Sequence, residues 1–226
     1  MKLIVVGATG LIGTEVIRQA LLHQSVTSVV ALGRRPTPPP ESIPVGPELE
    51  NFQLLAITPT ASKTMDFEAV RTVCVDYVLK GFDTLKQLPR PNGGKPLRFV
   101  YASGAKAERD QTKKPWILGD YTLMRKHKGR IETQLLEATT ESGGVMETCL
   151  LRIGLVKSPE RMGYITGMLA NAAAGIIGLP LIDIREIGGA AVSAAVHGFD
   201  KDTLDNDELI AMGRKELREI GEEPST

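Results

Sequence analysis

The chain has 226 residues, of which 42% are hydrophobic and 24% are charged, the composition of an ordinary globular domain. Its 27 basic residues match its 27 acidic ones, so net charge excludes a general attraction to nucleic acid or to an anionic membrane. No apolar run approaches the roughly 20 residues of a membrane span. The length of the chain favours a single α/β domain over residues 1–226.

The first element is an apolar run over residues 2–6, which leads directly into three glycines at positions 7, 10 and 13. This pattern predicts a buried strand, a tight turn and a helix over about Thr14–His23. Gly7 permits the turn, Gly10 lets the backbone approach a pyrophosphate, and Gly13 lets the helix pack on the strand. The helix N-terminus offers N–H groups and a positive dipole end to phosphates. The predicted dinucleotide contacts are Gly7, Thr9, Gly10, Leu11, Ile12 and Gly13.

A second buried strand is expected over Ser28–Leu32, and it ends in Gly33, Arg34 and Arg35. An acidic residue at this distance from the glycines would bind the ribose hydroxyls of NAD. Two arginines stand there instead, and guanidinium groups suit a 2′-phosphate through paired hydrogen bonds and stacking on adenine. The sequence therefore predicts NADP(H) held by Arg34 and Arg35, the alternative being a solvated basic turn.

Six prolines crowd residues 36–47, and the next strand follows almost at once over Phe52–Ile57. Proline lacks an N–H and fixes φ, which excludes a helix or central strand in the tract. About sixteen residues cannot hold the helices and strand of a complete doubly wound half. We expect the third strand and its crossover helix to be missing or vestigial, which would leave Ser28–Leu32 at a sheet edge. Thr58, in the loop after the strand, is a predicted cofactor contact because such loops border the ligand side.

The remaining elements continue the alternation of strands and helices. Strands are expected over residues 97–102, 149–156 and 181–184, and helices over 66–88, 120–142, 164–177, 187–197 and 207–220. The pattern predicts a Rossmann-type doubly wound parallel sheet with helices on both faces. Elements from about residue 157 to 226 are expected on the substrate side, where the small apolar stretch over 170–177 indicates an apolar small-molecule substrate or a tightly packed helix.

Cysteine and histidine usage gives no sign of a metal site or disulfide. Cys74 and Cys149 are isolated in apolar surroundings, as expected of buried reduced thiols in a cytoplasmic protein. His23, His127 and His197 are scattered without metal-ligand spacing or an obvious acidic partner. Nothing in the sequence indicates the oligomeric state.

Several motifs together indicate a family. They are the glycine motif over residues 6–13, Phe99–Gly104, Lys128–Glu132, Leu151–Val156 and Ile184–Val192. Through their order and spacing the chain resembles the atypical short-chain dehydrogenase/reductases, the NmrA-like and related NAD(P)-binding group, over nearly its whole length. The resemblance also implies that Ile153 borders the cofactor.

The resemblance implies a catalytic serine, tyrosine and lysine. Ser103 matches the serine that orients the substrate oxygen, and Lys128 takes the place of the lysine that holds the ribose. Met124 stands where the tyrosine is expected, and a thioether neither gives nor takes a proton. Tyr121 lies seven residues before Lys128, near the same helix face but about 10 Å along the axis. An alternative register pairs Tyr121 with Arg125, and a half-buried structural tyrosine is the third interpretation.

The leading hypothesis is an NADP(H)-dependent oxidoreductase that acts on a small or medium-sized carbonyl or alcohol, with Ser103, Tyr121 and Lys128 as catalytic residues. A redox-silent dinucleotide sensor or scaffold is the second hypothesis, which Met124 favours. The third hypothesis is an enzyme that uses the same pocket to catalyse a non-redox reaction such as isomerisation or cyclisation.

Overall fold

The computed structural model describes residues 1–33, 52–55, 75–89, 94–113, 120–157 and 179–224, without the side chains of 52–55 and 120–124. The chain divides into two compact units. The first comprises residues 1–60, 154–198 and 206–226, and the second comprises 61–153 and 199–205. Within the described ranges no helix is both long and apolar enough to cross a membrane.

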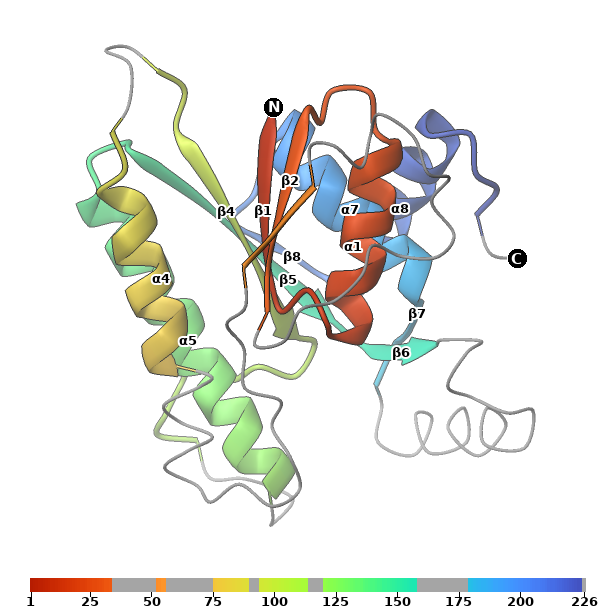
Figure 1. The fold of residues 1–226 in the computed structure, drawn as a ribbon. Coiled ribbons are helices and arrows are strands. Elements are labelled where there is room, and N and C mark those ends of the chain that lie inside the picture. The colour runs from red at the N-terminus through yellow and green to blue at the C-terminus, as the bar shows by residue number, and fades with distance from the viewer. Residues whose placement is uncertain (34–51, 56–74, 90–93, 114–119, 158–178, 225–226) are drawn as a thin grey trace. The chain divides into compact units, whose positions relative to one another are not determined.

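The first unit opens with a parallel three-stranded sheet in the order β1-β2-β3, of which Figure 1 labels β1 and β2. These strands are β1 (Lys2–Val6), β2 (Ser28–Leu32) and β3 (Phe52–Leu55). Helix α1 (Leu11–Leu22) connects β1 to β2 and buries its apolar face, including Val16, Ile17 and Ala20, in the core of this unit. A strand, a crossover helix and a parallel strand form the βαβ unit that the opening residues predict.

The sequence analysis expects the third strand and its crossover helix to be missing or vestigial. Between β2 and the strand over Leu97–Gly104, the described residues hold one strand, β3, and a helix over Tyr77–Lys86. The expectation that Ser28–Leu32 lies at a sheet edge is wrong. β3 pairs with β2 in parallel, from Phe52 beside Val29 to Leu55 beside Leu32, so β2 is flanked on both sides. This pairing satisfies backbone groups that an edge strand would leave open, and it fills the third place in the sheet. The expected crossover over 34–51 lies outside the described residues.

The C-terminal part of the first unit contains two short strands and two helices. Strand β6 (Leu155–Lys157) pairs in parallel with β7 (Leu181–Asp183). Asp183 begins α7 (Ile184–His197) with a capping box, because its side chain accepts from Arg185 N–H while the Glu186 carboxylate accepts from Asp183 N–H. Helix α8 (Asn206–Glu219) crosses α7 at backbone contact: a Cβ at position 213 would lie 2.0 Å from the Glu186 carbonyl oxygen.

The second unit has a parallel sheet in the order β4-β5-β8. Its strands are β4 (Leu97–Gly104), β5 (Met146–Ile153) and the two-residue β8 (Thr203–Leu204), and its helices are α4 (Tyr77–Lys86) and α5 (Asp120–Glu141). The core joins α4, α5 and β5 through Phe82, Ile131, Leu135, Met146 and Leu150. Strand pairing aligns Ser103 of β4 with Arg152 of β5, at the carboxyl ends of both strands.

Most elements expected from the sequence are confirmed with small shifts in their ends. The helix expected over 66–88 is seen as α4. The first residues of that expected helix, 66–74, lie outside the described residues, and so does the whole helix expected over 164–177. The strand expected over 149–156 is two strands, β5 and β6, interrupted at Gly154. A Cβ at Gly154 would lie 2.1 Å from the Pro180 carbonyl oxygen, so the chain passes too close there for a side chain.

Candidate functional site

The glycine turn of the first unit has the geometry that the sequence predicts. Gly7 follows β1 with φ of 84°, in the left-handed region that favours glycine, and its carbonyl accepts a hydrogen bond from Gly10 N–H at 2.8 Å. A Cβ at Gly13 would lie 2.2 Å from the same carbonyl oxygen. Thr14 Oγ1 donates to the carbonyls of Ala8 and Gly10 at 3.1 and 3.0 Å, which fixes the turn against α1.

The start of α1 is suited to bind an anion. Gly10 is its N-cap, so no capping side chain competes for the N–H groups of the first turn, and that turn contains no acidic residue. Thr9 and Gly10 are exposed, and Leu11, Ile12 and Gly13 are half-buried. Uncapped N–H groups with the positive end of the helix dipole are the donors that a phosphate needs. The residues present therefore fit the diphosphate of a dinucleotide.

Three predicted cofactor contacts cannot be placed. Arg34, Arg35 and Thr58 lie outside the described residues, so the preference for NADP(H) stays a prediction. Ile153 ends β5 with its side chain buried, and its carbonyl accepts from Ala105 N–H at 2.8 Å. Its role beside a cofactor also stays a prediction.

The second unit contains a buried polar cluster built around Glu132 of α5. The carboxylate is fully buried and accepts three side-chain donors: Ser103 Oγ at 2.6 Å, Arg152 Nη2 at 2.6 Å and Arg109 Nε at 2.7 Å. Arg109 Nη2 also donates to Thr203 Oγ1 at 2.7 Å. The cluster thus joins β4, β5, β8, α5 and the loop after β4.

These donors determine the ionisation of Glu132. Burial by itself raises the pKa of the carboxyl, but the hydrogen bonds from Arg152 and Ser103, with the positive charge of Arg152, outweigh it and hold the pKa below its ordinary value of 4.5. The same carboxylate raises the pKa of Arg152. Glu132 is therefore a buried anion matched by two guanidinium groups.

Ser103 is engaged in this cluster. Its side chain is buried and its single O–H donates to Glu132, so only its lone pairs are left to accept a further hydrogen bond. A serine that polarises a substrate carbonyl has to donate to the carbonyl oxygen. In this arrangement Ser103 would first have to release Glu132.

Lys128 lies beside Gly104, the residue that follows Ser103. A Cβ built at Gly104 would lie 3.4 Å from both Cδ and Nζ of Lys128, so the lysine side chain runs along the end of β4. The structure therefore brings together two of the three predicted catalytic residues. Tyr121 lies on the helical backbone of α5, but its side chain and that of Met124 are outside the described set.

The sequence analysis missed the residues that hold this end of the sheet. In that analysis Glu132 appears only as part of the motif that identifies Lys128, and no function is predicted for Arg109 or Arg152. Gly129 was not noticed, although a Cβ there would lie 1.8 Å from the Glu108 carbonyl oxygen, so α5 touches the loop after β4 backbone to backbone. The one available signal was Arg152, a charged residue inside an otherwise apolar predicted strand, which is a weak pattern.

Cys149 agrees with the expectation of an inert thiol. It is a free and fully buried cysteine of β5. Burial, with a smaller contribution from the charge of Asp202, raises the pKa of the thiol to about 12. Cys74 lies outside the described residues.

No protein-family model and no curated protein sequence matches the chain. Solved structures do match. A UDP-N-acetylglucosamine 4-epimerase from Methanobrevibacter ruminantium is 17% identical, with a TM-score of 0.60 over 91% of this chain and 75% of that one. A dTDP-glucose 4,6-dehydratase from Bacillus anthracis in complex with NAD is 12% identical, with a TM-score of 0.60 over 98% and 82%. A UDP-glucose 4-epimerase from Thermus thermophilus in complex with NAD is 16% identical, with a TM-score of 0.56 over 100% and 85%.

The chain has a Rossmann-type fold. The resemblance to short-chain dehydrogenase/reductases is thereby confirmed at the level of the fold. In a Rossmann-type fold, ligands bind beyond the carboxyl ends of the strands and at the first glycine turn. Gly7 follows β1, Ser103 and Gly104 end β4, and Ile153 ends β5. Gly7, Ser103 and Ile153 thus lie at or directly after the carboxyl ends of their strands, and their roles in binding stay predictions.

Proposed function

We propose that the protein binds a nicotinamide dinucleotide, NADP(H) in particular, and acts as an oxidoreductase on a small or medium-sized carbonyl or alcohol. The observation that supports dinucleotide binding most strongly is the glycine turn. Gly7 adopts a positive φ, Gly13 leaves no room for a Cβ, and α1 begins without a capping side chain. NADP(H) rather than NAD(H) rests on Arg34 and Arg35 alone.

The solved structures add to this proposal in general terms. Two of the neighbours described above are complexes with NAD. We expect such an enzyme to work in the cytoplasm without a nucleic-acid partner, and the small apolar stretch over residues 170–177 favours an apolar substrate. A bound NADPH would supply the hydride, and the chain would bind the dinucleotide, position the carbonyl and deliver a proton to its oxygen.

The dinucleotide site is tested with Leu11→Asp. Leu11 is the first residue of α1 and is half-buried. A carboxylate there interacts favourably with the helix dipole, so we expect folding to be preserved. The same charge repels a diphosphate at the helix N-terminus. Two charges about 5 Å apart interact by roughly 3 kcal/mol at an effective dielectric constant of 20, so the Kd for NADPH should rise by at least ~10-fold.

Leu11→Asn is the matched control, because it introduces a polar side chain of the same shape without the charge. Calorimetry with NADPH, NADP⁺, NADH and NAD⁺ gives the affinities, and thermal unfolding without ligand checks the fold. Equal NADPH affinity in both variants, or no binding of any of the four to the original chain at millimolar concentration, would overturn the dinucleotide proposal.

The hydrogen bond from Ser103 to Glu132 favours a second candidate function, a redox-silent dinucleotide sensor or scaffold. Ser103 would have to release Glu132 before it could orient a carbonyl, and Met124 stands where the tyrosine is expected. The epimerases among the structural neighbours leave isomerisation as a third use of the pocket.

Turnover distinguishes these functions. With a panel of carbonyl compounds, an oxidoreductase should consume NADPH. Tyr121→Phe and Lys128→Ala should then lower kcat by ~100-fold or more, with only a modest change in NADPH affinity. Absence of NADPH consumption with every carbonyl, despite tight binding of NADPH, would contradict the oxidoreductase and support the sensor. A variant effect confined to affinity would do the same.

A further inference from the structure

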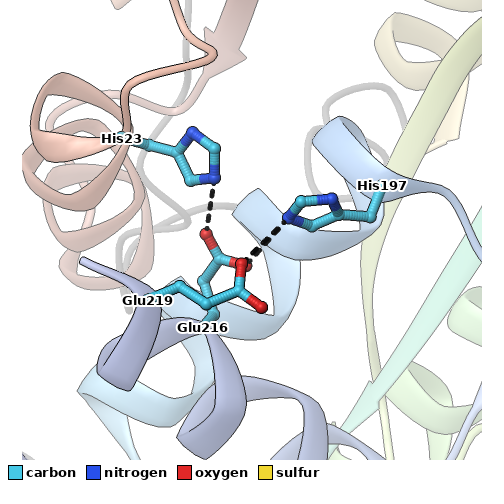
Figure 2. Close-up of side chains that lie close together, drawn as sticks. All are labelled: His23, His197, Glu216 and Glu219. Atoms are coloured by element: carbon cyan, nitrogen blue, oxygen red, sulfur yellow. Dashed lines mark ion pairs between the residues drawn. The ribbon is translucent and has the colours of Figure 1, made fainter. Parts of the chain in front are cut away.

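His23, His197, Glu216 and Glu219 converge at one place in the first unit, contrary to the sequence analysis, which treats the histidines as scattered and without acidic partners (Figure 2). His23 follows the end of α1, His197 ends α7, and the two glutamates lie one turn apart on α8. One nitrogen or oxygen from each residue lies within 4.8 Å of all the others. Three helices thus bring four potential ligands to one point.

Glu216 needs a partner that the described residues do not supply. Its side chain is 1% exposed, and neither carboxylate oxygen receives a properly directed hydrogen bond from the described part of the chain. Desolvation of an unpaired carboxylate is costly, so a buried carboxylate is normally paired or bound to a metal. His23 Nε2 lies 3.1 Å from Oε1 but is not directed for a hydrogen bond, and His197 Nε2 lies 3.6 Å from Oε2, beyond hydrogen-bond distance.

The side chains that approach the Glu216 carboxylate are two imidazoles. His23 is buried, and its Nδ1 accepts a hydrogen bond from Ser25 N–H at 3.0 Å. His197 is half-exposed, and Lys215 approaches Glu219 rather than Glu216, at 3.8 Å. Among the described side chains, the ion-pair contacts of the buried carboxylate are thus with imidazoles, which are also metal-binding groups.

The four ligand atoms lie within 4.8 Å of one another, close to but wider than the edges of a coordination tetrahedron, so a bound ion would draw them together with one oxygen of Glu216 coordinating. His23 Nε2 lies 3.1 Å from Glu216 Oε1, and His197 Nε2 lies 3.6 Å from Glu216 Oε2 and 3.3 Å from Glu219 Oε2. Zinc bonds to imidazole nitrogen and carboxylate oxygen are about 2.0–2.2 Å long, which sets ligand–ligand edges of about 3.3–3.6 Å in a tetrahedron. Charge-assisted hydrogen bonds are shorter, about 2.7–2.9 Å.

We propose that His23, His197, Glu216 and Glu219 form a binding site for a divalent transition metal, zinc in particular. Imidazole and carboxylate together favour zinc over magnesium or calcium, and two carboxylates neutralise the charge of the ion. Four protein ligands leave no open position for a substrate, so the site is structural and fastens α8 to α1 and α7. The half-exposed His197 and Glu219 give the ion its entry path.

Metal binding requires one rearrangement. To coordinate through Nε2, His23 has to hold its proton on Nδ1 and release the hydrogen bond from Ser25 N–H. The protein would lose the hydrogen bond from Ser25 N–H to His23 and would gain the bonds from the four ligands to the metal. Metal binding should accordingly shift the ¹⁵N resonances of His23 to those of the Nδ1-protonated tautomer.

The test uses the untagged full chain, stripped of metal with a chelator and then dialysed. Titration with Co²⁺ should give one equivalent of the intense visible absorption that tetrahedral cobalt shows, and Zn²⁺ should displace it and raise Tm by several degrees. His197→Ala and Glu219→Gln should each weaken Co²⁺ binding by at least ~10-fold. Both side chains are half-exposed, so the metal-free Tm should change little, which checks that the variants fold.

Matched controls are Glu223→Gln, an exposed glutamate one turn beyond Glu219, and His127→Ala in the other unit. Neither should alter Co²⁺ binding. Absence of the tetrahedral spectrum, or binding that survives both His197→Ala and Glu219→Gln, would overturn the proposal and leave the cluster as histidine–glutamate ion pairs. Leu11→Asp, which tests the dinucleotide site, should leave metal binding unchanged, so the two proposals fail separately.

Discussion

Replacing Gly13 by alanine should destabilise the first unit by about 3 kcal/mol or more. The new methyl carbon would lie 2.2 Å from the Gly7 carbonyl oxygen and 3.2 Å from the Ala8 Cα, and both of these neighbours are backbone atoms of the turn that cannot move aside alone. Separation of α1 from β1 is the only relief, and it would disrupt the same turn that is proposed to bind the diphosphate. Urea unfolding and NADPH calorimetry measure the two losses.

Gly81→Ala is the control for this substitution. Gly81 is also a helical glycine, in α4, but a Cβ there meets nothing within 4 Å. Alanine has a higher helix propensity than glycine, so this variant should be more stable than the original chain by about 0.5–1 kcal/mol. A Gly13→Ala protein as stable as the original would show that the turn and α1 are not packed as described.

The second large effect is expected for Glu132→Gln. This substitution removes the charge that Arg109 and Arg152 share and turns one acceptor oxygen into a donor that faces two donors. Breaking a buried ion pair on one side typically costs about 3–5 kcal/mol. Because the arginine side chains are 36% and 27% exposed and partly hydrated, we expect a loss near the lower end, about 3 kcal/mol, in the free energy of unfolding.

The pH dependence of stability should identify the charge of Glu132 as the cause. Its pKa is held below the ordinary value of 4.5 in the folded chain. The unfolded state therefore takes up a proton first as the pH falls, and the stability that the carboxylate contributes is complete above that value and is lost as the pH falls through the folded pKa. The difference in stability between the original chain and Glu132→Gln should be constant at neutral pH and shrink in acid below about 4.5.

Glu137→Gln, an exposed position on the same helix, is the matched control and should change stability by less than about 0.5 kcal/mol at any of these pH values. A difference between the original chain and Glu132→Gln that is the same in acid as at neutral pH would show that the carboxylate is not ionised in the folded protein.

Local patterns predicted the parts of the fold that depend on local chemistry. The apolar run and three glycines at the N-terminus specify strand, turn and helix through steric rules that act within thirteen residues, and the Gly7 and Gly13 geometry agrees. Helices such as α5 and α7 were predicted because their apolar periodicity is long. The edge position of β2 was predicted wrongly because strand pairing depends on residues far apart in the sequence, here Val29–Leu32 with Phe52–Leu55.

The candidate site shows the same division. Ser103 and Lys128 were placed by resemblance of short motifs, and the structure brings both to the end of β4. That the Ser103 hydroxyl would donate to Glu132 could not be predicted, because the bond depends on α5 lying across β4 and β5. The cluster of His23 with Glu216 joins residues 193 positions apart, and no local spacing encodes such a meeting.

Asn206, the first residue of α8, has a consequence for any shortened form of this chain. Its Oδ1 accepts from Gly154 N–H at 2.9 Å and its Nδ2 donates to the Leu181 carbonyl at 3.0 Å, so one amide completes the hydrogen bonding of the β6–β7 pair. A fragment cut before this residue would leave the Gly154 N–H and the Leu181 carbonyl without their hydrogen bonds to Asn206, and it would expose the glycine-containing face of α7 that α8 covers. The closing helix is thus an integral folding requirement, and a fragment without it should be a substrate for proteases rather than a smaller working domain.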